Sequence, residues 1–314
     1  MKVLFIDSVH PILEERLMAM GFKCDHDYEC YKEVLMAKLP EYIGLVLRSR
    51  IPIDEEVLAA ATKLKFIARS GAGLENIDCT EAAQKGIHLF SAPEGNRQAV
   101  GEHSIGMLLS LFNKLSLGDK EIRFGKWNRE TNRGIELAGK TVGIIGYGNM
   151  GKAFAKCLSG FNCTVLAYDK NKKTISDDYA CESSLENIQE KADIISFHTP
   201  YSPSTHHYLG EDFISKMKKP FYVINTSRGK VIHTDELVKG LKSNEILGAC
   251  LDVLEYEKSS FENMFDNNNM PESFRYLVSS PKVLLSPHVA GWTTESYKKL
   301  SLVLADKIEK LYSY

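Results

Sequence analysis

The stretch that most constrains the fold is residues 140–169, KTVGIIGYGNMGKAFAKCLSGFNCTVLAYD. A β-branched apolar run, a glycine-rich turn, a helical pattern and a second apolar run follow one another, which predicts a dinucleotide-binding β-α-β unit. Gly146, Gly148 and Gly151 have the spacing G-x-G-x-x-G. The first glycine of such a unit makes a tight turn, the second admits a pyrophosphate, and the third lets the helix pack on the strand. Free N–H groups at the start of the helix then bind the phosphates.

The acidic residue that ends the second predicted strand indicates which dinucleotide binds. Asp169 can accept hydrogen bonds from an adenosine ribose and repel a 2′-phosphate, which favours NAD over NADP. The glycine spacing alone is a weak signal, because such a turn can be purely structural. Here the strand, the helix and the acid are all in place, so we predict NAD binding, with further contacts from Tyr147, Asn149 and Met150 of the turn.

Composition limits the other classes of function. A chain of 314 residues is long enough for two domains, and 44% hydrophobic and 25% charged residues are ordinary for a soluble globular protein. The formal net charge of -2 gives no reason to expect a nucleic acid or a membrane surface as partner. We find no signal-peptide pattern at the N-terminus and no apolar run near the ~18 residues of a membrane span. The seven scattered cysteines are typical of reduced thiols, so we expect a cytoplasmic protein.

The first 92 residues alternate short apolar runs with helical patterns, which predicts a small α/β sheet. We expect strands at 3–6, 44–47, 66–68 and 87–90, and helices at 11–20 and 54–61. Open α/β sheets bind ligands beyond the carboxyl ends of their strands. Arg48 and Arg50 lie at one such end, and the turn SGAGLENID, residues 70–78, lies at another. Arg50 is as readily a solvated loop charge as a functional one, whereas we expect Arg48 to be functional.

The second half of the chain repeats the α/β pattern after an apolar helix. Residues 98–117 predict a helix that is buried or lies at a subunit interface, so we expect a homodimer. The polar stretch 124–134 predicts a loop. Strands are expected at 194–197, 222–225, 247–251 and 283–285, and each ends in polar residues. A longer insertion, 258–281, includes a polar loop at 266–269.

The polar residues at these strand ends could perform hydride transfer between a carbinol and a carbonyl. That reaction needs a cation to bind and polarise the substrate and a titratable group to move the hydroxyl proton. Arg228 can hold a 2-keto or 2-hydroxy carboxylate in two-point geometry. His288 belongs to the residue type whose ordinary charge change lies closest to neutral pH, which makes it a candidate for proton exchange. A carboxylate beside it would fix its tautomer, and Glu255 and Glu257 both remain open.

The remaining histidines are assigned differently. A lone histidine after proline is often structural, and only the agreement among the strand ends favours catalysis for His288. His198 lies nearer the centre of the predicted cofactor, so we expect it to contact NAD together with Thr199 and Pro200. His206 and His207 are interpreted as loop residues. No metal-ligand spacing is present, so no metal is expected.

Taken together, these motifs resemble the D-isomer-specific 2-hydroxyacid dehydrogenases. GIIGYGNMG, HTPYSPST, INTSRG, GACLDVLEYE and SPHVAGWT occur in the family's order and spacing. The resemblance implies Arg228, Glu257 and His288 as the catalytic arginine, acid and histidine. It also implies that Asp252, Thr226 and Ser227 lie near the cofactor, and that the Ser70-Gly71-Ala72 turn binds the substrate carboxylate through its backbone.

The resemblance further implies an α/β fold of two Rossmann-like, doubly wound domains with a cleft between them. The substrate domain would be discontinuous, formed by residues 1–97 and 288–314, and the NAD-binding domain would comprise residues 98–287.

Within the family, RSR at Arg48 and APEGN at Asn96 resemble phosphoglycerate dehydrogenases, where these positions and the adjacent Ser49 hold the substrate. We therefore expect oxidation of 3-phosphoglycerate in serine biosynthesis, with a glyoxylate/hydroxypyruvate or D-lactate-type reductase as the alternative. A non-enzymatic NAD(H)-sensing protein is the alternative of another class. The chain departs from the family pattern at Lys258, where the family often has proline, and in its long insertion. No regulatory domain is expected after residue 314.

Overall fold

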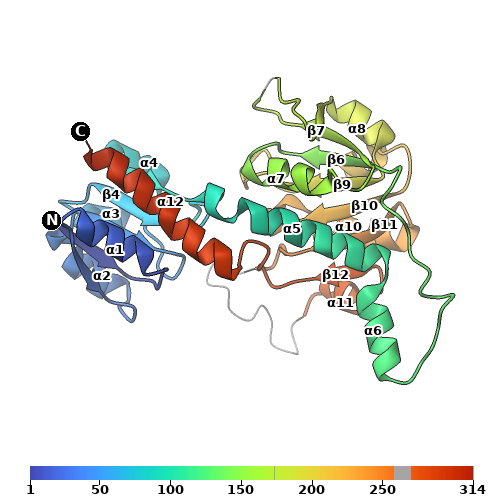
Figure 1. Cartoon of the computed structure of the whole chain (residues 1–314), viewed down its shortest axis with the longest axis horizontal. Helices are drawn as coiled ribbons and strands as arrows, with labels where there is room; N and C mark the ends of the chain where they lie inside the picture. The colour runs from blue at the N-terminus through green and yellow to red at the C-terminus, as the bar shows by residue number, and fades with distance from the viewer. Residues whose placement is uncertain (173, 258–269, 314) are drawn as a thin grey trace. The chain divides into compact units, whose positions relative to one another are not determined.

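The structure is a computed structural model that describes residues 1–172, 174–257 and 270–313 (Figure 1). The predicted polar loop at 266–269, and most of the insertion before it, lie outside these residues. The chain forms two compact units. Among the described residues, the N-terminal unit comprises 1–96 and 292–313, and the central unit comprises 97–257 and 270–291.

The N-terminal unit is built on a parallel five-stranded sheet of order β2-β1-β3-β4-β5. The strand β3 is GLVL with every residue buried, as expected where helices cover both faces of a parallel sheet. Because β2 and β3 flank β1 on opposite sides, the strand order reverses between β1 and β3. The strands are β1 (Lys2–Phe5), β2 (Lys23–His26), β3 (Gly44–Leu47), β4 (Phe66–Arg69) and β5 (His88–Phe90).

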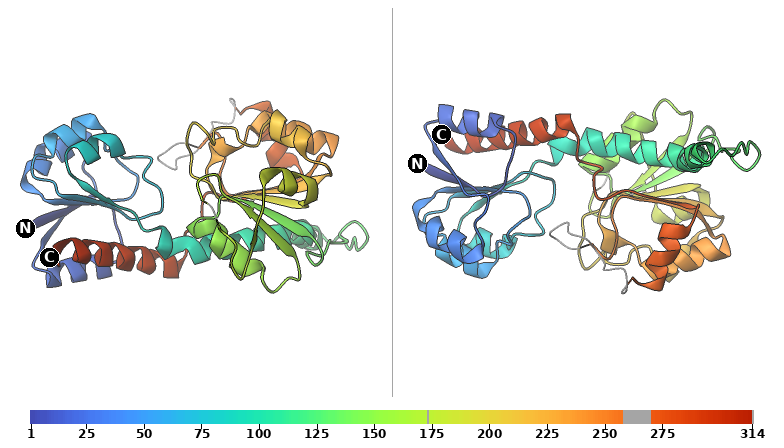
Figure 2. Two further views of the ribbon diagram at one scale, coloured as in Figure 1. Left: turned by 90° about the horizontal axis from the view of Figure 1, so that it is seen from above. Right: turned by 90° about the horizontal axis from the view of Figure 1, so that it is seen from below.

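Helices cover both faces of this sheet (Figure 2). On one face, α1 (Ile12–Ala19) and the C-terminal helix α12 (Thr294–Tyr312) lie side by side and pack on the sheet. A capping box between Thr293 and Ser296 starts α12. The other face is covered by α2 (Lys32–Lys38), which leads into the short helix η1 (Leu39–Glu41), and by α3 (Glu55–Ala60) and α4 (Cys79–Gln84).

The central unit is built on a parallel sheet of order β12-β11-β10-β9-β6-β7-β8. Its first strand, β6, lies between β9 and β7, so the order reverses there, next to the glycine turn. The strands are β6 (Thr141–Ile145), β7 (Thr164–Tyr168), β8 (Cys181–Glu182), β9 (Ile194–Phe197), β10 (Phe221–Asn225), β11 (Ile246–Leu251) and β12 (Val283–Leu285).

Two apolar clusters fix the helices of the central unit to its sheet. One cluster joins one face to α7 (Asn149–Leu158) and to the C-terminal part of α5 (Pro93–Phe112). The other joins the opposite face to α8 (Leu185–Lys191), α9 (Glu211–Lys216), α10 (Thr234–Ser243) and α11 (Glu272–Ser279). The short helix η2 (Gly229–Val231) follows β10. These two sheets confirm the predicted α/β class of doubly wound parallel sheets.

Several local predictions were wrong. The helix predicted at 98–117 is two helices, because Lys114 has a left-handed backbone with φ 51° and ends α5 before α6 (Leu115–Arg123). Its apolar residues Met107, Leu108 and Phe112 are buried in the core of the central unit, which explains why this stretch is apolar. The strand β2 and the helices α2 and α4 were missed. The sequence of β2, KCDH, has no fully buried residue, as expected of an edge strand.

The boundary after β12 also differs from the one expected. The residues after β12 up to Gly291 belong to the central unit, so this unit continues beyond residue 287. The reason is local, since the buried carboxylate of Asp252 accepts hydrogen bonds from the N–H groups of Val289 and Ala290.

Candidate active site

The glycine turn after β6 has no room for a side chain at two of its three glycines. Gly146 has φ +94°, and a Cβ there would lie 2.8 Å from the carbonyl oxygen of His198. A Cβ at Gly151 would lie 2.2 Å from the carbonyl oxygen of Gly146, so the helix can approach the turn only at a glycine. Gly148, in contrast, faces open space and provides no side-chain cap for α7. The N–H groups of the first helical turn thus remain available to an anion.

The segment after β9 flanks this turn and contains two buried polar atoms that have no partner in the described part of the chain. The Nδ1 atom of His198 and the Oγ1 atom of Thr199 form no hydrogen bond among the described residues. The Nε2 atom of His198 pairs with Oγ of Ser196 at 2.8 Å. Burial lowers the pKa of His198 to about 3, so its ring is neutral at physiological pH. Pro200, which follows, is exposed. Unpartnered polar atoms beside the turn fit a polar ligand in this crevice.

Asp169 lies at the end of β7, on the other side of the turn. Its Oδ2 accepts a hydrogen bond from the N–H of Tyr147 at 2.9 Å, and its Oδ1 accepts one from the N–H of Asn171 at 3.0 Å. The half-exposed carboxylate is thereby held against the glycine turn. The ring of Tyr147 is buried and its hydroxyl donates to Asp177 at 2.8 Å, so this side chain packs inside the unit. Asn149 and Met150 are half-buried at the start of α7.

On the opposite side of β6, an asparagine organises the turn after β10. The Oδ1 atom of Asn225 accepts from the N–H and the hydroxyl of Ser227, and its amide donates to the carbonyl oxygen of Arg228 at 3.0 Å. The preceding hydroxyl, of Thr226, pairs with Ser104 of α5 at 3.2 Å. This network fixes the backbone from which the guanidinium of Arg228 extends.

The next residue, Gly229, allows this turn to contact the loop after β11. A Cβ at Gly229 would lie 1.8 Å from the carbonyl oxygen of Leu254, so only glycine fits there. The N–H of Leu254 in turn donates to Oε1 of Glu257. The turn that contains Arg228 and the loop that contains Glu257 are therefore in direct backbone contact.

Glu257 is paired with His288. Its Oε2 lies 2.6 Å from Nδ1 of the histidine, and both side chains are half-buried. A carboxylate at Nδ1 fixes the ring orientation and assigns the proton of the neutral ring to that nitrogen. Glu257 is itself oriented by the N–H of Leu254, so neither partner depends on solvent for its position.

The backbone around His288 is held in an uncommon conformation. The residue has φ 53°, in the left-handed region, and its N–H donates to the carbonyl oxygen of Asp252 at 2.8 Å. The carboxylate of Asp252 accepts from the N–H groups of Val289 and Ala290 at 2.9 and 2.8 Å and from the hydroxyl of Ser286 at 2.6 Å. Strain of this kind persists only where the surroundings fix it, and it is concentrated at functional sites.

Asp252 is charged although it is almost completely buried. Burial alone would raise its pKa, but hydrogen bonds from His103, from Ser286 and from the backbone of Ala290 and Val289 outweigh burial and lower it. The carboxylate expected near the nicotinamide is thus engaged in holding the turn of His288. His103 and Ser286 complete this network with a contact of 2.9 Å.

Glu255, the other acid considered at sequence level, has a different partner. Its Oε1 lies 2.6 Å from Nε2 of His207, and its Oε2 accepts from the N–H of Thr234 at the start of α10. It therefore connects the loops after β9, β10 and β11, and the acid beside His288 is Glu257. His207 is thus an element of this connection and not a simple loop residue.

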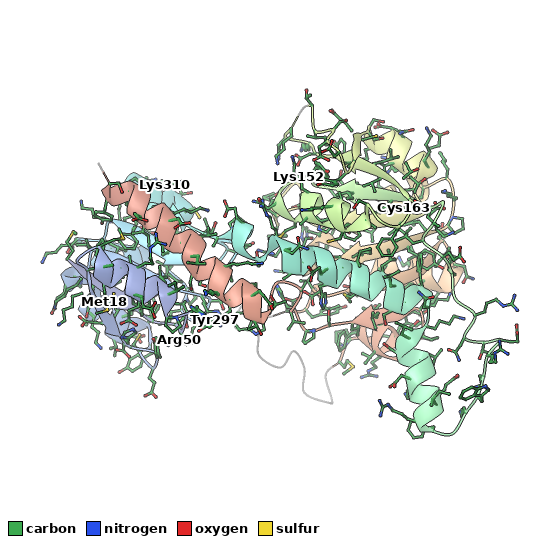
Figure 3. The ribbon with its side chains drawn as sticks, in the orientation of Figure 1. Met18, Arg50, Lys152, Cys163, Tyr297 and Lys310 are labelled. Carbon is green, nitrogen blue, oxygen red and sulfur yellow. The ribbon has the colours of Figure 1, made fainter. Side chains whose placement is uncertain are left out.

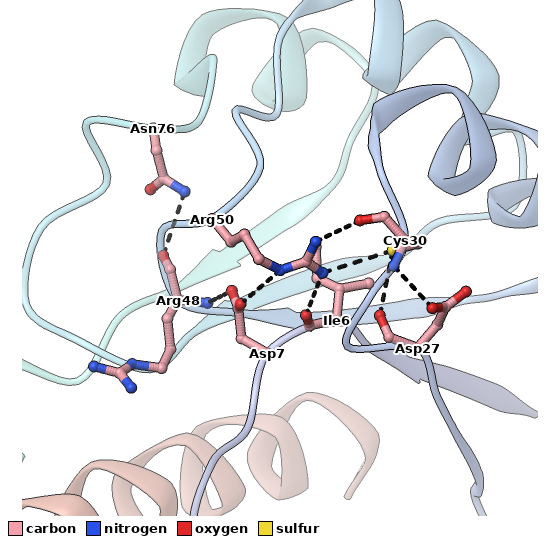
Figure 4. Close-up of polar contacts among 7 residues, drawn as sticks. All are labelled: Ile6, Asp7, Asp27, Cys30, Arg48, Arg50 and Asn76. Carbon is pink, nitrogen blue, oxygen red and sulfur yellow. Dashed lines mark hydrogen bonds and ion pairs between the residues drawn. The ribbon is translucent and has the colours of Figure 1, made fainter. Parts of the chain in front are cut away.

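Two arginines follow β3 in the N-terminal unit, and they differ in their contacts (Figure 4). The guanidinium of Arg50 donates to Asp7 and to the carbonyl oxygens of Ile6 and Cys30, so it is a structural residue. The guanidinium of Arg48 points away from this network and stacks over the ring of Trp292, 4.1 Å from its centroid. Its neighbour Ser49 is half-buried.

The other predicted substrate residues of the N-terminal unit follow β4 and begin α5. The N–H of Ser70 donates to Leu47, whereas the N–H groups of Gly71 and Ala72 have no acceptor in the described part of the chain. These two adjacent donors are the part of the turn that can bind a carboxylate. The buried Oδ1 atom of Asn96 forms no hydrogen bond within the described residues.

Within the ranges 1–172, 174–257 and 270–313, no three or more His, Cys, Asp or Glu side chains are grouped so that they could hold a metal ion. No helix in that same part of the chain has the length and apolar character needed to cross a membrane.

Comparison with known proteins agrees with this geometry. Residues 105–290, which cover most of the central unit, match the model of the D-isomer specific 2-hydroxyacid dehydrogenase, NAD binding domain. The chain belongs to the D-isomer-specific 2-hydroxyacid dehydrogenase family. NAD is accordingly the cofactor of the central unit, and the open Gly148, the uncapped start of α7 and the unpartnered atoms of His198 and Thr199 fit it.

Individual members of the family are similar over nearly the whole chain. A hydroxypyruvate reductase of Thermotoga maritima is 33% identical over 89% of this chain and 88% of its own length. A D-3-phosphoglycerate dehydrogenase of Archaeoglobus fulgidus is 32% identical over 98% of this chain, which spans only 56% of that relative. The crystal structure of a D-lactate dehydrogenase from Aquifex aeolicus, complexed with NAD and lactic acid, has a TM-score of 0.83 at 25% identity and covers 99% of this chain and 95% of its own.

Sequence reasoning did not identify several residues of the site. Asn225 and Ser286 could have been found, because each is a small polar residue inside or directly after an apolar strand, where an unpaired polar group is costly. His103 and Trp292 left no such signal. Their partners are far away in the sequence, and only the fold brings them together.

Proposed function

We propose that this chain is an NAD-dependent oxidoreductase that transfers hydride between the nicotinamide and C2 of a small D-2-hydroxy acid. The observation that supports this best is the 2.6 Å contact between Glu257 and Nδ1 of His288. A histidine oriented in this way by a carboxylate is the arrangement that proton exchange with a substrate hydroxyl requires.

In the direction of oxidation, Nε2 of His288 takes the proton of the C2 hydroxyl while hydride leaves C2. Glu257 stabilises the imidazolium that forms, because its carboxylate accepts the Nδ1–H. In the direction of reduction, the same nitrogen returns the proton to the carbonyl oxygen. The chemistry supplied by bound NAD is acceptance or donation of the hydride.

Arg228 binds the carboxylate of the substrate and polarises its C2 oxygen, since a guanidinium offers two parallel donors and stays charged. Its position is supported by the bonds of Asn225 and by the contact of Gly229 with Leu254. The cofactor is held by the glycine turn, Asp169 and the strand-end residues named above. Asp169 favours NAD over NADP by repelling a 2′-phosphate.

We propose 3-phosphoglycerate as the substrate, oxidised to 3-phosphohydroxypyruvate as a step of serine biosynthesis. Arg48, with Ser49 and Asn96, would hold the phosphoryl group, and the donors of Gly71 and Ala72 the carboxylate. On this proposal the N-terminal unit, expected as residues 1–97 and 288–314 and observed as 1–96 and 292–313, supplies substrate binding, and the central unit binds NAD. Reduction of hydroxypyruvate, glyoxylate or pyruvate is the alternative. A hydroxypyruvate reductase and a glyoxylate reductase are as similar in sequence as the phosphoglycerate dehydrogenase, and D-lactate dehydrogenases are similar in structure.

We propose that the protein is cytoplasmic and forms a homodimer. Four large apolar side chains on α6 and in the segment after it are exposed, as is common where a second subunit packs. They are Leu115, Ile122, Phe124 and Trp127.

A panel of substrates tests the proposed function. The absorbance of reduced nicotinamide gives the rate with each substrate, and kcat/KM is the quantity compared. We expect kcat/KM to be highest for oxidation of 3-phosphoglycerate. The other substrates of the panel are D-glycerate and D-lactate for oxidation, and hydroxypyruvate, glyoxylate and pyruvate for reduction. A higher kcat/KM with a non-phosphorylated acid would overturn the substrate. Silence across the panel, with NAD binding intact, would favour an NAD(H)-sensing protein.

A further inference from the structure

The guanidinium of Arg48 occupies a position where α/β sheets bind ligands. The strand order of the N-terminal unit reverses between β1 and β3, and Arg48 directly follows β3. Ligands of open α/β sheets bind in the crevice that opens at such a reversal, beyond the carboxyl ends of the strands. Asp7, which follows β1, accepts the N–H of Arg48 at 2.6 Å and so ties the two strand ends together.

The backbone of Arg48 is fixed on both sides. Besides the bond of its N–H to Asp7, its carbonyl oxygen accepts from Nε of Arg69 at 3.1 Å and from the amide of Asn76 at 3.3 Å. Figure 4 shows the bonds to Asp7 and Asn76. The side chain therefore extends from a backbone with little freedom, and only its own torsions remain to be fixed.

The side chain is fixed by an aromatic ring and not by an acceptor. No hydrogen-bond acceptor contacts the guanidinium of Arg48 in residues 1–172, 174–257 and 270–313, although the side chain is half-buried and its burial lowers its pKa. Its contact is the face of Trp292, at 4.1 Å. Trp292 in turn packs edge-on against Tyr297 of α12, with ring centroids 5.8 Å apart, and Figure 3 shows Tyr297 near the start of that helix.

We propose that Trp292 is a positioning residue that holds the guanidinium of Arg48 ready for the non-reacting anionic group of the substrate, a phosphoryl group or a second carboxylate. Stacking on a ring uses the flat face of the guanidinium and leaves its N–H edges for an anion. A carboxylate partner would instead occupy those edges and compete with the ligand. This inference rests on the proposed function for the identity of the ligand, but not for the binding itself.

Arg50 is the internal contrast. Its N–H groups already donate to Asp7 and to two backbone carbonyl oxygens, so it has no comparable edge to offer. The two arginines are separated by one residue in sequence. The N–H groups of Arg50 already have acceptors in the chain, which makes it a structural residue, whereas those of Arg48 remain for a ligand.

The two tryptophans of the chain make the binding measurable without turnover. Replacement of the exposed Trp127 by Phe leaves Trp292 as the single tryptophan. Titration of this variant with inorganic phosphate should change its emission in a saturable way, because an anion on the guanidinium alters the charge above the indole. The change should be absent when Arg48→Met is added. A flat titration, or one that Arg48→Met does not alter, would overturn the proposal.

Kinetics provide the second test. Trp292→Leu should raise KM for 3-phosphoglycerate about tenfold at unchanged kcat, whereas Trp292→Phe, which keeps a ring, should restore KM to within about twofold. The KM for hydroxypyruvate, which lacks a second anionic group, should stay constant in both variants. Tyr31→Leu is the matched control, since it removes another exposed aromatic residue of the same unit.

The outcomes separate the two proposals. A saturable, Arg48-dependent emission change without turnover of any substrate would leave the anion site standing and reject the enzymatic function. Turnover of 3-phosphoglycerate with the same KM in Trp292→Leu would reject the role of Trp292 and leave the function standing. If kcat fell and KM rose in both Trp292 variants, the role of Trp292 would be merely structural.

Discussion

His288 in the central unit and Arg48 in the N-terminal unit are both functional candidates, but they are held in opposite ways. His288 is fixed by a hydrogen bond to a carboxylate and by a backbone that Asp252 holds in place, since Asp252 accepts from the N–H groups of His288, Val289 and Ala290. Arg48 has a tied backbone as well, yet its charged group rests on a ring. One side chain is held through its polar atoms, and the other through its apolar face.

The difference is consistent with the roles that we propose for the two groups. A group that exchanges a proton benefits from a carboxylate on its second nitrogen, because that partner stabilises the charge that forms. A group that binds an anion loses by such a partner, because the partner is itself an anion. Contacts within the folded chain therefore distinguish a reacting group from a binding group before any ligand is present.

Removal of the imidazole of His288 should have the largest effect and tests the contrast between His288 and Arg48 most directly. His288→Asn should lower kcat by about 10³, because the proton acceptor is lost while the backbone conformation is one that asparagine tolerates. NAD binding, measured by the fluorescence of the reduced cofactor, should persist. Undiminished turnover would remove His288 from the mechanism.

Removal of the partner carboxylate should have the next largest effect. Glu257→Gln keeps the shape of the side chain and its bond with Leu254 but not its charge, and we expect kcat to fall about 100-fold. The dependence of kcat on pH should change together with its size. If the variant retained both the rate and the pH profile, Glu257 would have no role in orienting His288.

Acid should weaken the central unit through His198. Burial holds the pKa of His198 at about 3 in the folded chain, whereas histidine ordinarily has a pKa of about 6.5, so the unfolded chain takes up a proton at this residue first as the pH falls. The contribution of neutral His198 to the free energy of unfolding is complete above pH ~6.5 and decreases below it. At pH 5 the free energy of unfolding is lower by about 2 kcal/mol. Hydrogen exchange of amides in β6 and β9, compared with β1 and β3, measures this loss, and His198→Gln should reduce it.

The smallest effect is expected at Arg50. Arg50→Gln should destabilise the N-terminal unit by roughly 1 kcal/mol, since it removes partly exposed hydrogen bonds, and it should leave KM unchanged. Denaturant unfolding measures the change. Arg16→Gln is the matched control, because its ion pairs with Asp306 and Glu309 lie at the surface and should contribute less. A KM that rises in Arg50→Gln would contradict the division between the two arginines.

Much of the central unit could be predicted from the sequence, because its motifs are local. The glycine turn, the strand ends and the spacing of TSRG and SPH depend on neighbouring residues, and each was found near its expected position. The choice between Glu255 and Glu257 could not be made from residue types. Both are glutamates in one loop, and only the fold shows that the first contacts His207 and the second His288.

The N-terminal unit was harder to predict. Arg48 and Arg50 have the same side chain and are separated only by Ser49, and what distinguishes them is the set of acceptors that distant strands bring to Arg50. Trp292 follows the central unit in sequence but packs in the N-terminal unit, beside Arg48. The break before α6 depends on the left-handed backbone of a lysine, which no residue preference indicates.

Gly229 has a consequence beyond the fit of its own turn. Because a Cβ there would overlap the carbonyl oxygen of Leu254, the separation between the loops of Arg228 and Glu257 is set by the lack of a side chain. Any larger residue would move the cation and the acid of the site apart in a single step. Replacement by alanine, the smallest change possible, should thus act as a double defect, in binding of the substrate and in transfer of its proton.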